Sequence, residues 1–447
     1  MPQSNVVITG VGVVSSIGIG GEAFFQALLD KRSGITSLAN RTDLGPKPNP
    51  DSQPAGLWIG GPVTDFNPKE YVKPRKALKV MCREIQMAFA ASQMAIQQAG
   101  LDTVLPAAED GSITPDTIGT VFGSEMYYGS PGEMEDAVRG CMDEDGEIIG
   151  SRFGQAAMKN VMPLWMLKYL PNMPACHVGI SINAQGPNNT LVLGDVSGPA
   201  AVTESVSCLQ RGNTRVMLAG ASGTRIGTTR LNYSIDIPIG EMYDPVERSS
   251  RPFDPLSRGV IGGEAAATVV LETSGEVAKR NGTALARVAS YASRFVPSKN
   301  MTNRPRSVAL DATESRASRA AMELAIEAAI QDANIDVKSI GLIVSHAMGD
   351  PVVDQQEIAA IEKTIPGVPV TATIASLGHT GAASGMIDIA TGALAIMNRT
   401  VPPTLMTETS DTTVGLLDEA KPLEGDCVLV LSHTSNGNAT AIILSNP

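Results

Sequence analysis

The sequence has little of what disulfide frameworks, metal-binding fingers and nucleic-acid surfaces are built from. Its 447 residues include five cysteines, none of them in CxxC spacing, which argues against both a disulfide framework and a zinc site. Aromatic residues make up 4% of the chain and the net charge is −12, so neither base stacking nor binding to a phosphate backbone is favoured. We therefore expect no nucleic-acid partner.

Signals for membranes and cofactors are also missing. No uninterrupted apolar run reaches the roughly 18 to 20 residues of a spanning helix, and no basic-then-apolar leader precedes the first strand. The chain has no GxxxxGK[ST] loop and no HExxH pair, and Ser15 stands where a dinucleotide fingerprint that begins Gly10-Val-Gly12 needs its third glycine. We expect a cytoplasmic protein with no membrane span, no metal and no cofactor.

Apolar β-branched runs alternate with helical patterns along the chain. The runs at 6–14, 120–123, 214–220, 267–272, 340–345 and 426–432 are typical of buried strands in parallel sheets covered by helices. Two alanine-rich amphipathic helices, predicted at 83–100 and 314–334, each end in a short acidic turn. This pattern predicts an α/β fold with an internal duplication, whose halves are 1–255 and 256–447. The Pro- and Gly-rich stretch 45–65 is predicted to be a surface loop.

One dense cluster of basic residues interrupts the acidic chain. It comprises Lys69, Lys73, Arg75, Lys76 and Lys79, with Arg83 close behind. Two interpretations stay open: a solvated helix end, or a docking surface for an acidic partner.

Two of the four histidines stand at loop entries. His346 follows a predicted strand, and His379 lies in a turn of small residues. Imidazoles at such places can hydrogen-bond a developing oxyanion or move a proton; the alternative is that each only caps its loop. A third element is a strand after Gly186 that runs through a Gly-containing turn at Asp195 into a helix, with Pro199 in the first helical turn. A nucleophile elbow has this form.

Short motifs are spread over nearly the whole chain. They are the opening VVITGVGVVSSIG, the segment 75–101, Val121-Phe-Gly-Ser, Gly186-Pro, Ser250-Arg-Pro-Phe-Asp254, Arg258-Gly, Gly262-Gly-Glu264, the loops around His346 and His379, and Val401-Pro-Pro-Thr404. With them the sequence resembles the β-ketoacyl-acyl-carrier-protein synthases of type II fatty-acid and polyketide systems, in the thiolase superfamily. The resemblance implies a thiolase-like, duplicated five-layer αβαβα fold. It also implies substrates carried as thioesters on an acidic acyl carrier protein, and a homodimer or a heterodimer with an intact synthase.

The resemblance also implies site residues, and here the sequence departs from the family. The family has a cysteine at the elbow, two histidines, a lysine before the second histidine, and a phenylalanine-containing C-terminal loop. His346 and His379 match the two histidines, with Asp350 or Asp354 in place of a nearby acidic residue. The positions that differ are Asp195 for the cysteine, Ile374 for the lysine, and His433 and Ser435 for the two phenylalanines.

These differences bear on the chemistry expected of the site. A thiolate exchanges one thioester for another at similar energy, whereas the Asp195 carboxylate would have to form a much more reactive anhydride. We therefore expect a non-condensing subunit that binds acyl chains, comparable to a chain-length factor. The alternatives are an acyltransferase or malonyl-carrier-protein decarboxylase acting through His346 and His379, and a free-standing acyl-binding protein. For Asp195, a purely structural role in stabilising the N-terminus of its helix stays open. The three side chains are predicted to share one pocket.

Overall fold

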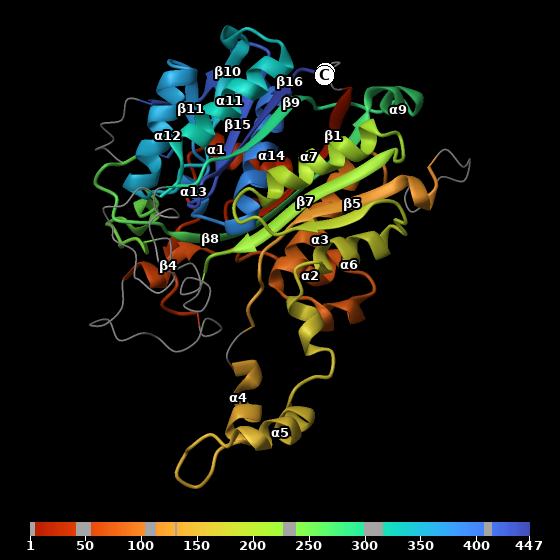
Figure 1. The fold of residues 1–447 in the computed structure, drawn as a ribbon, viewed down its shortest axis with the longest axis vertical. Coiled ribbons are helices and arrows are strands. Elements are labelled where there is room, and N and C mark those ends of the chain that lie inside the picture. The colour runs from red at the N-terminus through yellow and green to blue at the C-terminus, as the bar shows by residue number, and fades with distance from the viewer. Residues whose placement is uncertain are drawn as a thin grey trace.

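Two sets of five β-strands, one from each half of the chain, form the frame of the molecule (Figure 1). The computed structural model describes residues 5–41, 55–102, 113–129, 132–226, 238–298, 316–405 and 414–447. The first set comprises β1 (Val6–Ser15), β5 (Ile118–Gly123), β6 (Asn188–Leu191), β7 (Val216–Thr224) and β8 (Gly262–Thr273). The second comprises β9 (Ala286–Phe295), β10 (Ile340–Val344), β11 (Pro369–Thr371), β15 (Cys427–His433) and β16 (Asn438–Ser445). Short strands complete the list: β2 (Gly18–Ile19), β3 (Thr36–Ser37), β4 (Ile59–Gly61), β12 (Thr400–Val401), β13 (Gly415–Leu416) and β14 (Lys421–Pro422).

The two sets repeat one topology. The first runs β1-β8-β7-β5-β6 and the second β9-β16-β15-β10-β11, and in each the first three strands are antiparallel while the last three are parallel. The sets join where β1 pairs with β9 through Val7 and Ile8. The predicted duplication is therefore seen in the strand order. The prediction of wholly parallel sheets is wrong, because β15 returns directly into β16 through a tight connection with no crossover helix.

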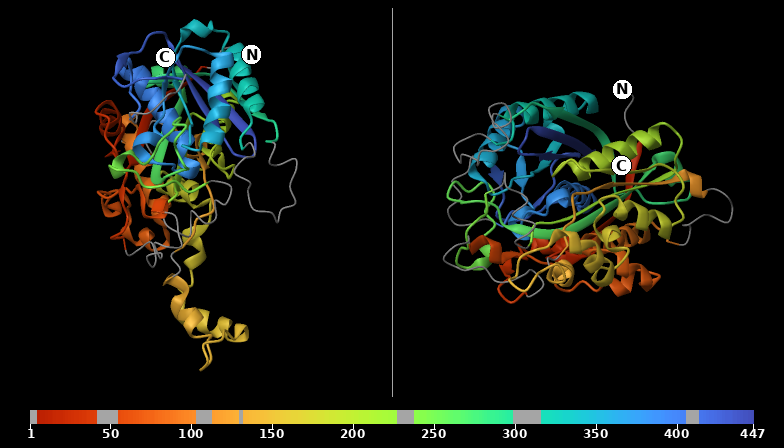
Figure 2. Two further views of the ribbon diagram at one scale, coloured as in Figure 1. Left: turned by 90° about the vertical axis from the view of Figure 1, so that its left-hand side faces the viewer. Right: turned by 60° about the horizontal axis from the view of Figure 1, so that its bottom comes forward.

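Helices fill the layers between and outside these sheets (Figures 1 and 2). The long ones are α1 (Gly21–Leu29), α3 (Arg83–Gln98), α6 (Met173–Ser181), α7 (Ser197–Gln210), α11 (Arg319–Ala333), α12 (Pro351–Thr364) and α14 (Ser384–Asn398). α3 and α6 cover the outer face of the first sheet, α11 and α12 that of the second, and α7 and α14 pack against each other between the sheets. This is the five-layer αβαβα arrangement that the resemblance implied. Each helical layer has its own buried apolar cluster.

Most local predictions agree with these elements. All six predicted strands are present, and the helices predicted at 83–100 and 314–334 appear as α3 and α11, which occupy equivalent places in the two halves. The loop predicted at 45–65 is wrong in part. Residues 42–54 lie outside the described ranges, but β4 within this stretch pairs with β3 and β8, because Gly60 and Gly61 allow its backbone to lie against Gly262 and Gly263.

The strand pairing indicates where the two halves of the chain meet. β8 pairs with β1 and β7 of the first half, and the next strand, β9, pairs with β16 of the second. We propose that the halves meet between Thr273 and Ala286, later than the 255/256 boundary predicted from the sequence.

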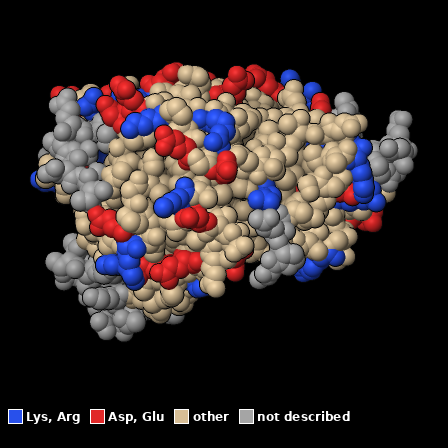
Figure 3. All heavy atoms as spheres, turned by 90° about the horizontal axis from the view of Figure 1, so that it is seen from above, with Lys and Arg blue, Asp and Glu red and all other residues tan. Residues whose placement is uncertain are grey.

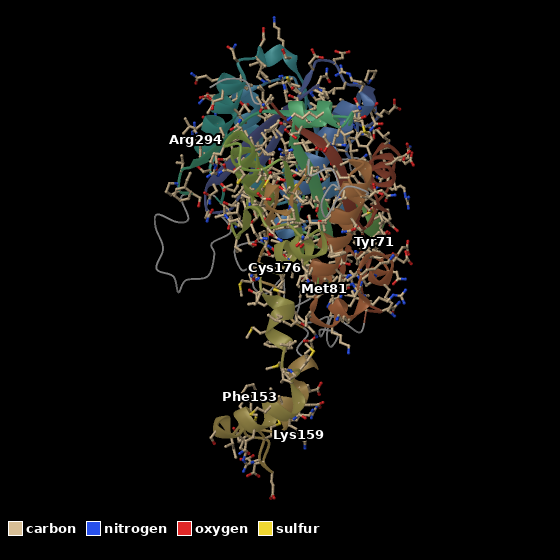
Figure 4. All side chains as sticks on the ribbon, turned by 90° about the vertical axis from the view of Figure 1, so that its right-hand side faces the viewer. Tyr71, Met81, Phe153, Lys159, Cys176 and Arg294 are labelled. Atoms are coloured by element: carbon tan, nitrogen blue, oxygen red, sulfur yellow. The ribbon has the colours of Figure 1, made fainter. Side chains whose placement is uncertain are left out.

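A slender arm projects from the body below α6 (Figure 1). It carries α4 (Gly132–Arg139) and α5 (Phe153–Asn160), and its base is tied by Trp165 and Lys168, which both contact the Glu133 carboxylate. Figure 4 shows Phe153 and Lys159 at its far end. Among the described residues, the other α-helices are the short α2 (Pro68–Tyr71), α9 (Ser274–Lys279) and α13 (Ile374–Leu377). Among the described residues, no helix combines the length and apolar character needed to cross a membrane.

Candidate functional site

Asp195 lies in the turn between β6 and α7, as the sequence predicts. Gly194 has φ +65°, a conformation that a residue with a side chain rarely adopts, and it reverses the chain just before Asp195. The Ser197 hydroxyl accepts a hydrogen bond from Leu193 N (2.8 Å) and donates one to Gly194 O (2.6 Å). Pro199 stands in the first turn of α7. These contacts make the turn a fixed elbow that holds Asp195 at the N-terminus of a helix.

Close packing of α7 against α14 brings the second half of the chain next to this elbow. A Cβ on Gly198 would lie 2.9 Å from Met386 Cβ, so glycine allows the start of α7 to press against the start of α14. His379 precedes α14. Its backbone is fixed to the first sheet, since His379 N donates to Ile261 O and Gly263 N donates to His379 O, both at 2.8 Å. The imidazole is thereby held beside the elbow.

The loop that carries His346 is fixed by one carboxylate, that of Glu357. His346 follows β10, and its backbone N donates to Glu357 Oε1 (3.2 Å), which also accepts from the Ser345 hydroxyl (2.6 Å). Glu357 Oε2 accepts from Ala347 N (2.9 Å) and lies 3.0 Å from His433 Nε2. Glu357, on α12, is fully buried, so this carboxylate ties the His346 loop to the end of β15.

The three predicted residues meet in the interior. Asp195 Oδ2 lies 3.2 Å from His379 Nε2 and 3.5 Å from His346 Nε2. Asp195, His379 and His346 are 7%, 1% and 2% exposed as whole residues, so bulk water scarcely reaches them. Neither contact has hydrogen-bond geometry, and within the described ranges the ring nitrogens of both histidines have no hydrogen-bond partner. Their predicted proximity is confirmed; their chemical roles stay predictions.

The charges within this cluster strongly shift the pKa of Asp195 and that of His346. Burial alone would raise the pKa of Asp195, but His379 and His346 outweigh it and hold that pKa well below its ordinary range. Burial lowers the pKa of His346, whereas Asp195 and Asp388 raise it, with a net pKa of about 10. Without any further ligand, the site thus favours a carboxylate beside an imidazolium.

Two acidic residues that the sequence analysis missed surround the histidines. Asp388 Oδ2 lies 3.9 Å from His346 Nδ1, and its Oδ1 accepts from the Thr373 hydroxyl (2.8 Å). Burial raises the pKa of Asp388, an effect that His346 opposes. Glu357 has the opposite balance, because His433 outweighs burial and lowers its pKa. The signal available in the sequence was a lone aspartate in the otherwise apolar stretch of α14.

Asp350 and Asp354, which the resemblance sets in place of the family's nearby acidic residue, accept hydrogen bonds from Arg316 and from backbone N–H groups. Asp350 Oδ2 accepts from Arg316 Nε (2.8 Å). Asp354 accepts from the backbone N–H groups of Met348 (2.8 Å), Gly349 (3.0 Å) and Phe253 (2.8 Å). Burial raises the pKa of Asp354 to about 7 despite these donors. The structure brings Asp388 and Glu357, rather than these two, to the histidine rings.

The other predicted pocket residues have different surroundings. His433 is fully buried and packs edge-on against His346, with ring centroids 4.9 Å apart. Ile374 is buried in the apolar cluster of the second sheet. Ser435 is half-buried, and its carbonyl accepts from Ala317 N (2.8 Å). His433 therefore belongs to the histidine cluster itself.

The predicted basic cluster lies on α2 and the 3₁₀ helix Arg75–Val80. Its five members are exposed, and in the described part of the chain none has a carboxylate within ion-pair distance: Lys69, Lys73, Arg75, Lys76 and Lys79. Arg83 turns inward to Glu264 and Val63 O instead. Seen from above, the end of the molecule away from α2 has Lys and Arg mixed with Asp and Glu (Figure 3).

Comparison with known proteins agrees with this architecture. The family model for the β-ketoacyl synthase N-terminal domain matches residues 3–276, and the model for its C-terminal domain matches residues 307–408. The chain is 28% identical to a putative polyketide β-ketoacyl synthase 1 of Streptomyces halstedii, over 99% of this chain and 98% of the relative. It is 26% identical to a 3-oxoacyl-[acyl-carrier-protein] synthase 2 of Staphylococcus aureus, over 92% and 89%. The solved ishigamide ketosynthase/chain length factor superposes with a TM-score of 0.76 over 99% of both chains, at 22% identity. The chain belongs to the β-ketoacyl synthase family.

Proposed function

We propose that the protein is a non-condensing subunit of fatty-acid or polyketide assembly that binds acyl chains in the manner of a chain length factor. The observation that carries this proposal is Asp195, whose carboxylate occupies the elbow and lies against both His346 and His379. Condensation needs a nucleophile that accepts an acyl group from a thioester and releases it again. A carboxylate would have to form an anhydride, which lies well above a thioester in free energy.

The experiment is incubation with acyl carrier protein loaded with an acyl or a malonyl group, followed by intact mass measurement of both proteins. We expect no covalent acyl adduct on the wild-type chain. A stable acyl group on any of its residues would contradict the proposal. The variant Asp195→Cys tests whether the nucleophile alone was lost, since it should accept an acyl group if His346 and His379 remain competent.

A second candidate function rests on the two retained histidines. Their imidazoles are buried and adjacent, as proton transfer and oxyanion stabilisation require, and they would serve malonyl decarboxylation or acyl transfer. The same incubation separates the two candidates. Conversion of malonyl- to acetyl-carrier protein by wild type, lost in His379→Gln, would favour the decarboxylase.

The basic cluster supports an acidic carrier protein as partner. Exposed cations that form no ion pair with a described carboxylate attract an acidic surface over a distance of about a Debye length. Reversing Lys73 and Lys76 to Glu should slow association, and added salt should mimic the loss. The control is Lys338→Glu, an exposed lysine at the N-terminal end of β10. Salt-insensitive binding that the double variant leaves unchanged would assign the cluster to ordinary solvation.

The arm supports assembly as a homodimer or as a heterodimer with an intact synthase. Apolar side chains of the arm are exposed beyond what a free surface favours, for example Met158 at 89%, Ile148 at 63% and Met166 at 58%. A second subunit would bury them. Sedimentation of the chain alone, and of the chain mixed with a Cys-His-His synthase, distinguishes the two forms; a chain that stays monomeric in both samples would contradict the assembly.

We also place this function in the cytoplasm. None of the five cysteines, all of which lie in the described residues, forms a disulfide, and four of them are buried. Cysteines outside disulfides are usual where the compartment is reducing. Fractionation of cells expressing the chain would test this.

A further inference from the structure

We propose that Asp195, His346 and His379 form a binding site for one divalent transition-metal ion. One donor atom from each residue lies within 4.8 Å of the other two, and all three side chains are buried. The inference goes beyond the acyl binding proposed above and does not depend on it.

The separations suit a common metal. Ligand bonds of about 2.1 Å place neighbouring donors about 3.4 Å apart around a tetrahedral ion and about 3.0 Å apart around an octahedral one. The Asp195 oxygen lies 3.2 Å from His379 Nε2 and 3.5 Å from His346 Nε2, close to both values. The two histidine nitrogens lie within 4.8 Å of each other, so a bound ion would draw them closer together.

The orientation of the rings is a second observation. The Nε2 atoms of His346 and His379 both face a single carboxylate oxygen, yet neither makes a hydrogen bond to it, and both side chains are at least nine-tenths buried. Without a metal, the ion pair with Asp195 is the interaction that these nitrogens face, and it lacks hydrogen-bond geometry. A metal ion would satisfy both nitrogens and the oxygen at once.

The surroundings resemble those that hold metal ligands in place. A ligating histidine usually has its other ring nitrogen directed at a carboxylate, which fixes the ring. His346 Nδ1 lies 3.9 Å from Asp388 Oδ2, and Asp388 is itself held by the Thr373 hydroxyl. Asp388 is thus a positioning residue for His346, while the backbone of His379 is fixed to β8.

The donor set defines the class of ion. Two imidazoles and one carboxylate suit Zn²⁺ and Fe²⁺ and leave coordination positions open for a small ligand, such as a carbonyl oxygen. Hard ions such as Ca²⁺ and Mg²⁺ prefer sites made of oxygens alone. The sequence prediction of no metal rested on missing local motifs, whereas these ligands come from positions 195, 346 and 379, which only the fold brings together.

The test is calorimetric titration of Zn²⁺ into protein that has been stripped with chelator and freed of it. We expect one Zn²⁺ per chain in the wild type, loss of this binding in Asp195→Asn and His379→Gln, and an affinity about 10- to 100-fold weaker in Asp388→Asn. His177→Gln is the matched control, since His177 lies in α6 away from the cluster, and its binding should equal that of the wild type. Absence of stoichiometric binding in the wild type, or binding that survives in both ligand variants, would overturn the site.

X-ray absorption at the zinc edge of the wild type keeps the test decisive if a variant fails to fold. We expect a shell of nitrogen and oxygen ligands at about 2.0–2.1 Å with the outer scattering of imidazole. A sulfur shell at about 2.3 Å would show that a cysteine binds the metal and would refute the proposed ligands. Because neither measurement involves an acyl chain, failure here leaves the proposed acyl binding intact, and the reverse also holds.

Discussion

Glu357→Gln should loosen the loop that carries His346 while leaving the fold in place. The Glu357 carboxylate has four neighbours that can donate to it: the Ser345 hydroxyl, the backbone N–H groups of His346 and Ala347, and His433 Nε2. A glutamine keeps one acceptor oxygen for Ser345 and His346. Its NH₂ group can donate to His433 in the other ring tautomer but faces the Ala347 N–H.

The size of the expected loss of local stability depends on how many hydrogen-bonding groups each substitution leaves unpaired. One buried N–H without an acceptor costs about 1–3 kcal/mol, and loss of the negative charge weakens the remaining bonds. We expect a local destabilisation of about 2–3 kcal/mol for Glu357→Gln and at least about 4 kcal/mol for Glu357→Ala, which leaves all four neighbours without this acceptor.

Hydrogen exchange of the peptide that contains residues 345–349 measures this directly. A loss of about 2–3 kcal/mol corresponds to protection that falls roughly 30- to 150-fold, because 1.4 kcal/mol is a factor of ten. The control is Glu362→Gln, an exposed residue of the same helix, for which protection should not change. Unaltered protection in Glu357→Gln would refute the view that this buried carboxylate positions the loop.

Two further predictions concern stability. The folded pKa of Asp354, about 7, lies above its ordinary value of 3.8, so its protonated form favours folding; that contribution is complete below pH about 4 and is lost as the pH rises to about 7. Relative to Asp354→Asn, wild type should lose up to about 4 kcal/mol of unfolding free energy across this range, and parallel urea-unfolding curves for the two proteins would count against it. Gly198→Val should lower the free energy of unfolding by about 1–3 kcal/mol or more, because the valine side chain would overlap Met386. The control Gly275→Val, which has open space around it, should lower the free energy of unfolding less. Equal thermal midpoints for the two variants would show that α7 and α14 can separate without penalty.

The local elements could be read from the sequence because their signals are local. Apolar β-branched runs gave every predicted strand, and Gly194 with Pro199 marked the elbow, since a positive φ and the start of a helix each depend on only a few neighbouring residues. The repeat of helix and strand patterns likewise indicated two similar halves. The identity of the residue at the elbow, Asp195, was sufficient to argue against thioester exchange.

Tertiary structure decided what those elements bring together. Asp195 meets His346 and His379 only because α7 and α14 pack between the two sheets, a contact between halves that no local pattern encodes. The part played by Glu357 depended on which face of α12 turns inward, and a helix with charged residues on several faces does not reveal this in one sequence. Asp388 is the lone charged residue of α14, and its place beside His346 depended on how that helix packs between the sheets. The sequence by itself determined the strands, the elbow and the aspartate that stands at it. The folded chain alone determined that a carboxylate and two imidazoles share one buried site, because residues far apart in the chain can converge only after the surfaces between them have packed.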